Sequence, residues 1–232
     1  MNMRKWVKLP SAWMEEGGLS AFKWRAETGA SETAALMVLM AIAHRADLAD
    51  GLARTTYDEL TIATGISRTK VADGLDVLAA RNLLVREPDG RSTYQLTNYG
   101  EGHVWAALPA KPLYDRTGAM PMFDDFHLRK AAELDALKIY LAFAARRDTT
   151  QNVARITYEQ ISDYAGIHLG KIKKALGILN INGLVTVESY ERMDGLPGAS
   201  HGYRLAHLFP RLHAGTTGRA TRGQGDDSRN YE

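Results

Sequence analysis

The residues best suited to chemistry lie in one short basic stretch, HLGKIKKALG. It places three lysines on the outward side of a predicted helix and contains no acidic residue. Ammonium groups clustered in this way neutralise phosphate groups, so the pattern favours contact with the backbone of DNA over a covalent reaction. The residues of this stretch predicted to contact DNA are His168, Gly170, Lys171, Lys173 and Lys174.

A counterpart of this stretch, SRTKVADGLD, lies 101 residues earlier. Its front is basic, but Asp73 and Asp76 follow, and both would face phosphates at an electrostatic cost. DNA is therefore expected to be held chiefly by the later stretch. The residues predicted to contact DNA here are Ser67, Arg68, Thr69 and Lys70.

Further basic residues fall in a predicted β-hairpin after each stretch. Asp89-Gly90 is a strong hairpin turn between two short strands, and a hairpin with a longer tip follows the later stretch. An ordinary solvated surface is the alternative for every basic residue named so far. The hairpin residues that could touch DNA are Arg86, Arg91, Arg192, His201 and Arg204.

These paired stretches belong to an internal duplication. ARTTYDEL at residues 53–60 returns as ARITYEQI at residues 154–161, and identical residues recur between the copies without a gap. Each copy has an apolar helix upstream, predicted in the first copy from an N-cap at Ser31 to about Arg45. That helix is apolar on nearly all sides, so it is expected to be buried.

Two further helices and a turn follow in each copy. Thr56 and Glu59 have the spacing of a capping box, and Gly65 is expected to end the helix with positive φ. Thr157 and Gly166 repeat this pattern. The third helix carries an apolar stripe toward the core, and a hairpin comes after it. The order is therefore helix, short strand, helix, turn, helix and hairpin.

This order predicts an α+β, mostly helical fold of two tandem winged helix-turn-helix domains. Because each copy has its own apolar helix, each is expected to fold by itself. The predicted divisions are a first domain at 1–97, a linker with a pre-strand at 98–125, a second domain at 126–213 and a disordered tail at 214–232.

Composition and the apolar segments of the chain limit where the protein can act. The net charge is +2, so a basic surface must be local, and the chain has no cysteine. The N-terminal MNMRKWVKLPSAW lacks the apolar core of a signal peptide, and the longest apolar run, residues 34–43, is too short to cross a bilayer. A cytoplasmic protein without membrane contact is expected.

The stretch TTYDELTIATGISRTKVADGLDVLAARNLLV, preceded by WVKLPSAW and a long apolar helix, resembles the winged-helix domains of plasmid and phage replication initiators. Its core pattern is shared with MarR-like and GntR-like regulators. The resemblance covers most of residues 5–208. It implies double-stranded DNA as partner, with a second copy of the chain and replication proteins as further candidates.

Two other functions stay open on the sequence. One is a transcriptional regulator of the same fold. The other is a protein-interaction scaffold in chromosome segregation or primosome loading, where winged helices hold partner proteins. Catalysis is not expected, because the sequence has no phosphate-binding glycine loop, zinc-protease motif or nucleophile elbow. No metal site and no cofactor are predicted.

Overall fold

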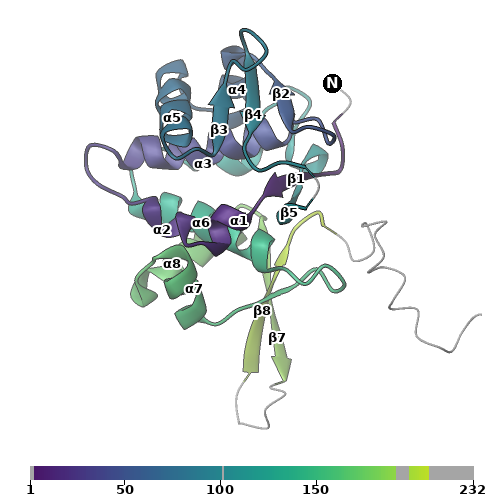
Figure 1. Ribbon diagram of the computed structural model, residues 1–232. Coiled ribbons are helices and arrows are strands. Elements are labelled where there is room, and N and C mark those ends of the chain that lie inside the picture. Colours follow the sequence, from purple (N-terminus) through teal and green to yellow (C-terminus); the bar gives the residue numbers. More distant parts are fainter. Residues whose placement is uncertain (1–2, 101, 192–198, 209–232) are drawn as a thin grey trace, which may run out of the picture.

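A computed structural model of the protein describes residues 3–100, 102–191 and 199–208. Over these residues the chain forms an α+β fold of helices and small antiparallel sheets (Figure 1), which confirms the predicted class. The predicted tail at 214–232 lies outside the described residues. We call residues 3–100 the first half and residues 102–208 the second half.

The first half begins with a strand and two short helices before its long helix. Its elements are β1 (Trp6–Pro10), α1 (Ala12–Glu15), α2 (Gly18–Ala21), α3 (Gly29–Ala43), β2 (Leu52–Arg54), α4 (Tyr57–Thr64), α5 (Arg68–Ala80), β3 (Leu84–Arg86) and β4 (Thr93–Leu96).

The second half repeats this order, with two 3-10 turns in place of α1 and α2. Its elements are β5 (Trp105–Pro109), η1 (Lys111–Leu113), η2 (Pro121–Phe123), α6 (Ala131–Arg146), β6 (Ala154–Arg155), α7 (Tyr158–Ala165), α8 (Leu169–Ile181), β7 (Val185–Glu191) and β8 (Ala199–Leu205).

Strands pair within each half, and one further strand pair connects the two halves. Each half has a three-stranded antiparallel sheet, ordered β2-β4-β3 and β6-β8-β7. The pre-strands β1 and β5 pair with each other, with Val7 opposite Leu108. Figure 1 shows the β3–β4 hairpin at one end of the molecule and the β7–β8 hairpin at the opposite end.

The helix ends confirm the predicted local chemistry. Thr56 and Glu59 form a full capping box at the start of α4, and Thr157 and Gln160 form another at the start of α7. Both helices end at a left-handed glycine, with φ of 71° at Gly65 and 62° at Gly166. The predicted N-cap at Ser31 is wrong, because α3 begins two residues earlier and the Ser31 hydroxyl donates to Asp73 at 3.1 Å.

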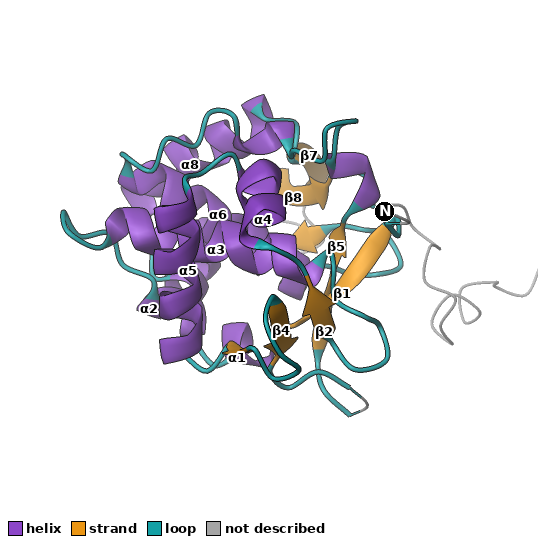
Figure 2. Ribbon diagram, turned by 90° about the horizontal axis from the view of Figure 1, so that it is seen from above, coloured by secondary structure: helices purple, strands orange, loops and turns teal. Residues whose placement is uncertain are grey.

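One apolar core runs through both halves. Helix α3 is buried along nearly its whole length, as predicted, and it packs against α6 as well as against α4 and α5. Figure 2 shows α3 and α6 side by side near the centre of the molecule. This differs from the expectation of a separate core in each copy, because each long helix uses the other to cover one of its sides.

The predicted linker also belongs to this packing. It contains β5. Beyond this strand, the hydroxyl of Tyr114 is hydrogen-bonded to Nδ1 of His44, near the end of α3, with 2.9 Å between the two atoms. Burial and the neighbouring Arg45 lower the pKa of His44 to about 3. His44 is therefore neutral at physiological pH and acts as part of the core.

The two turn glycines differ in what surrounds them, which gives a stability prediction. A Cβ at Gly65 would meet nothing within 4 Å, whereas one at Gly166 would lie 2.7 Å from Cβ of Ser20 in α2. Gly65→Ala should therefore cost only the left-handed strain, about 1 kcal/mol. Gly166→Ala should cost clearly more, because α2 must move away.

Urea unfolding of the two variants measures this difference. Equal losses in the two proteins would show that α2 does not press on the turn between α7 and α8.

Candidate nucleic-acid interface

The sequence around α8 fixes which side of the helix faces outward. Ile167 is 3% exposed and fills the turn, and the backbone N–H of Gly170 donates to Nδ1 of His168 at 3.2 Å, so His168 caps the helix. The opposite helix side is exposed because the core takes the apolar stripe. The buried residues of that stripe are Ile172, Ala175, Leu176 and Leu179.

The three predicted lysines lie on this outward side. Lys171, Lys173 and Lys174 are all exposed, and in the part of the chain that the structure describes none of their side chains makes a hydrogen bond or ion pair. Of the three, only Lys171 influences a nearby acid: the pKa of Asp135 in α6 is raised by burial, and Lys138 and Lys171 oppose that shift. The face of α8 therefore presents three lysine side chains without an ion pair among the described residues.

Neither glycine on this side is required by internal packing. A Cβ at Gly177 would meet nothing within 4 Å, and one at Gly170 would meet only the ring of His168, at 3.5 Å. No side chain projects from α8 at these two positions, so another molecule can approach the helix backbone there.

The matching face of α5 is different, because its cations are paired within the protein. Arg68 binds Asp58 at 2.6 Å, and Lys70 binds Asp73 at 2.7 Å. Ser67 caps the helix by accepting from the backbone N–H of Lys70, and Thr69 is exposed. The hydrogen bond from Lys70 is the main reason that the pKa of Asp73 is lowered.

In the first hairpin, Arg86 is paired in the same way, whereas among the described residues Arg91 is not. Arg86 binds Asp76 and also donates to the Tyr57 hydroxyl at 2.8 Å. Asp73 and Asp76, which were expected to face phosphates, are therefore each bound to a cation of the protein itself. Arg91 is exposed, with no ion pair among the described residues.

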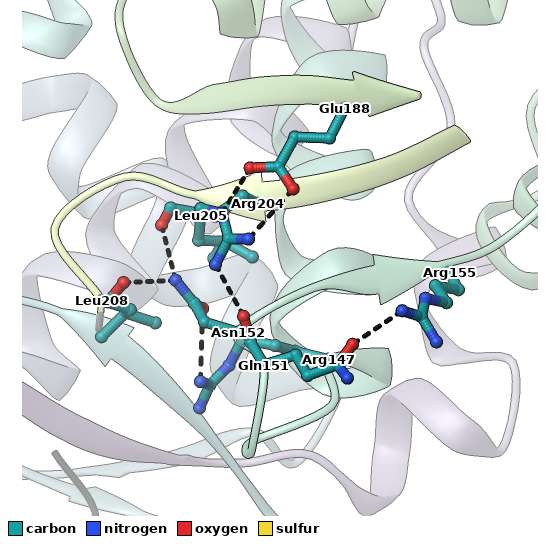
Figure 3. A network of polar contacts seen from close by, with 8 residues as sticks. All are labelled: Arg147, Gln151, Asn152, Arg155, Glu188, Arg204, Leu205 and Leu208. Atoms are coloured by element: carbon teal, nitrogen blue, oxygen red, sulfur yellow. Dashed lines mark hydrogen bonds and ion pairs between the residues drawn. The ribbon is translucent and has the colours of Figure 1, made fainter. Parts of the chain in front are cut away.

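In the second hairpin, Arg204 is part of a polar network and does not project freely (Figure 3). Its Nε and Nη2 lie 2.7 Å and 3.0 Å from the two carboxylate oxygens of Glu188, and its Nη1 donates to the carbonyl of Gln151 at 2.6 Å. These bonds hold Arg204 within the hairpin, and its contact with DNA stays a prediction that would require exchange of its bonds to Glu188. His201 is exposed, and Arg192 lies outside the described residues.

The same network contains a residue that the sequence reading missed. Asn152 is fully buried, donates to the carbonyls of Leu205 (3.2 Å) and Leu208, and accepts from Arg147 at 3.3 Å (Figure 3). A signal existed, because Asn152 stands 101 residues after Gly51 and both have positive φ, 56° and 77°. Asparagine is one of the few residues that accept this conformation.

In comparisons with known proteins, no family model, curated protein or solved structure matches the chain. Among the described residues, no helix is long and apolar enough to cross a membrane. Over the same residues, no group of three His, Asp or Glu side chains is placed to hold a metal ion.

The Arg204 network leads to a prediction about stability. Arg204→Met removes a two-point bond to a carboxylate and leaves Glu188 without that partner, so it should destabilise the protein by about 1–2 kcal/mol after allowance for partial exposure. Lys173→Met, on the open face of α8, should change stability by less than about 0.5 kcal/mol.

Chemical denaturation of both variants at one salt concentration makes the comparison. A loss no larger for Arg204→Met than for Lys173→Met would mean that the network contributes nothing to the hairpin.

Proposed function

We propose that this protein binds double-stranded DNA sequence-specifically through two winged helix-turn-helix units, with α8 making most of the phosphate contacts. In each half the proposed unit consists of the helix pair joined at the left-handed glycine and the hairpin that follows. A winged helix lays its third helix in the major groove, which assigns α5 and α8 as the groove-facing helices.

The observation that carries this proposal is the contrast in charge pairing between α8 and α5. Lysines without ion-pair partners release DNA counterions on binding without first losing a bond inside the protein. Arg68, Lys70 and Arg86 must instead exchange an aspartate for a phosphate, so their net gain is smaller. Lys171, Lys173 and Lys174 therefore supply the larger share of affinity.

Sequence choice requires contacts to base edges, which come from the start of the groove-facing helix. On α8 these positions are His168, Leu169 and Gly170, and Leu169 is 45% exposed although it is apolar. An exposed leucine there suits contact with a thymine methyl group. On α5 the corresponding exposed residues are Arg68 and Thr69.

Within DNA binding, we propose initiation of replication of a plasmid or similar mobile element. Two DNA-contacting helices in one chain can occupy two adjacent major grooves, which suits a protein that binds repeated sites. A transcriptional regulator and a protein-interaction scaffold are the alternatives, and each corresponds to a distinct result of the experiments below.

The charge contrast predicts how affinity responds to salt. Alanine at Lys171, Lys173 and Lys174 together should weaken DNA binding more than alanine at Arg68 and Lys70. Each phosphate contact that is lost should lower the slope of log affinity against log salt by about 1. Lys130→Ala, an exposed lysine at the start of α6, is the control and should leave the slope unchanged.

Binding is measured on a duplex containing the protein's own site across a salt series. Loss of binding only in the α5 variant would reverse the assignment of the two helices. Weak, salt-insensitive binding by every protein, parent included, would support the scaffold instead.

Footprinting on the DNA that flanks the protein's own gene separates initiator from regulator. Protection of several direct repeats beside an AT-rich region is the result expected for an initiator. Protection of a single palindrome would instead indicate a transcriptional repressor.

A further inference from the structure

The segment before α3 in the first half packs against the second half. We call residues 11–28, which include α1 and α2, the N-terminal arm. Helix α1 contacts α6 and α2 contacts α7, and Figure 1 shows both short helices beside α6. Glu15 of the arm lies 3.2 Å from Arg146, and Ser20 touches the turn at Gly166.

At the centre of this contact is a buried lysine. Lys138 of α6 is 2% exposed, and its Nζ donates to the carbonyl oxygen of Phe22 at 3.0 Å. Phe22 ends α2 and is itself 1% exposed. The bond therefore joins the arm to the long helix of the other half, away from water.

The duplication shows that the fold does not need a lysine at this place. The residue 101 positions before Lys138 is Met37, which is fully buried in α3. Asp135, one turn before Lys138, likewise corresponds to Ala34. An apolar pair fits the same helix positions in the first half, so packing alone does not explain the charged pair in the second.

Burying Lys138 has an energetic cost. Loss of hydration is the main cause that lowers its pKa to about 8, while Asp135 and Glu32 oppose the shift and Lys23 adds to it. Glu32 is itself bound to Arg81 at 2.7 Å, so it is not a dedicated partner of Lys138. A buried polar contact that costs stability can be retained because it selects one arrangement among several.

We propose that Lys138 is a positioning residue that holds the two halves, and with them α5 and α8, in one relative orientation. If the protein binds DNA as proposed above, on which this inference rests, the orientation sets the distance between the two DNA segments that the protein recognises. Lys138→Met, which introduces the residue used by the first half, should keep each half folded and loosen the relation between them.

The orientation can be measured without DNA. The chain has no cysteine, so Ala80→Cys and Ile181→Cys introduce two unique labelling sites at equivalent, exposed ends of α5 and α8. Pulsed electron spin resonance should give one narrow distance distribution for the doubly labelled parent and a broader or shifted one with Lys138→Met. Lys130→Met, at the exposed N-cap position of α6, should match the parent.

A distribution for Lys138→Met that is as narrow as that of the parent, with the same maximum, would overturn the proposal. A second measurement needs no variant at residue 138 and covers the case in which Lys138→Met fails to fold. Acetylation of the folded parent, followed by mass spectrometry, should modify Lys138 at least about tenfold more slowly than Lys130. Equal rates would show that the buried contact is not maintained, and would also overturn the proposal.

Selection from a random duplex library tests the consequence for DNA. The parent should recover two sequence elements at one spacing, and Lys138→Met should recover the same elements at several spacings. One spacing for both proteins would reject the role of Lys138 while leaving DNA binding intact. No enrichment by either protein would reject the DNA-binding function, and the distance and acetylation measurements would then decide the role of Lys138.

Discussion

The packing of α3 against α6 is the constraint on which the rest of the structure depends. Both helices are buried on nearly every side, and a helix of that kind is stable in a small protein only when all its sides are covered. The elements of one half cover part of each helix, and the other half covers the remainder. Pairing of β1 with β5 and docking of the N-terminal arm follow from bringing these helices together.

Around this shared core the two halves keep the same local design but differ in charge. The capping boxes, left-handed glycines and apolar stripes recur almost unchanged. The surface does not recur: aspartates pair with Arg68, Lys70 and Arg86 in the first half, whereas the lysines of α8 have no such partners among the described residues. Two halves with the same order of elements thus differ in that, within the described residues, the cations on α5 are paired with aspartates and those on α8 are not.

At two positions, a polar residue of the second half stands where the first half has a small or apolar residue. In each case the polar side chain binds a segment that is distant in the chain. Asn152 occupies the position equivalent to Gly51 and binds the end of the second hairpin. Lys138 occupies the position equivalent to Met37 and binds the N-terminal arm. In both cases the backbone conformation is retained and the side chain adds a contact to a distant carbonyl. The differences between the copies are therefore as informative as their similarities.

The sequence by itself determined the features that depend on near neighbours in the chain. The helix starts at Thr56 and Thr157, the glycine turns, the buried long helices and the outward lysines of α8 all follow from spacing within about ten residues. The repeat then transferred each assignment from one copy to the other. Most of the element order was predictable on this basis.

Apart from the local Lys70–Asp73 pair, only the tertiary structure decided which of these charges are paired and how the halves meet. Asp58 and Arg68 are ten residues apart, Asp76 and Arg86 belong to different elements, and Phe22 and Lys138 lie in different halves. No periodicity in the sequence encodes these pairs, because each depends on where the core places two distant segments. The shared core was missed for the same reason: an apolar helix shows that it must be buried, but not by which part of the chain.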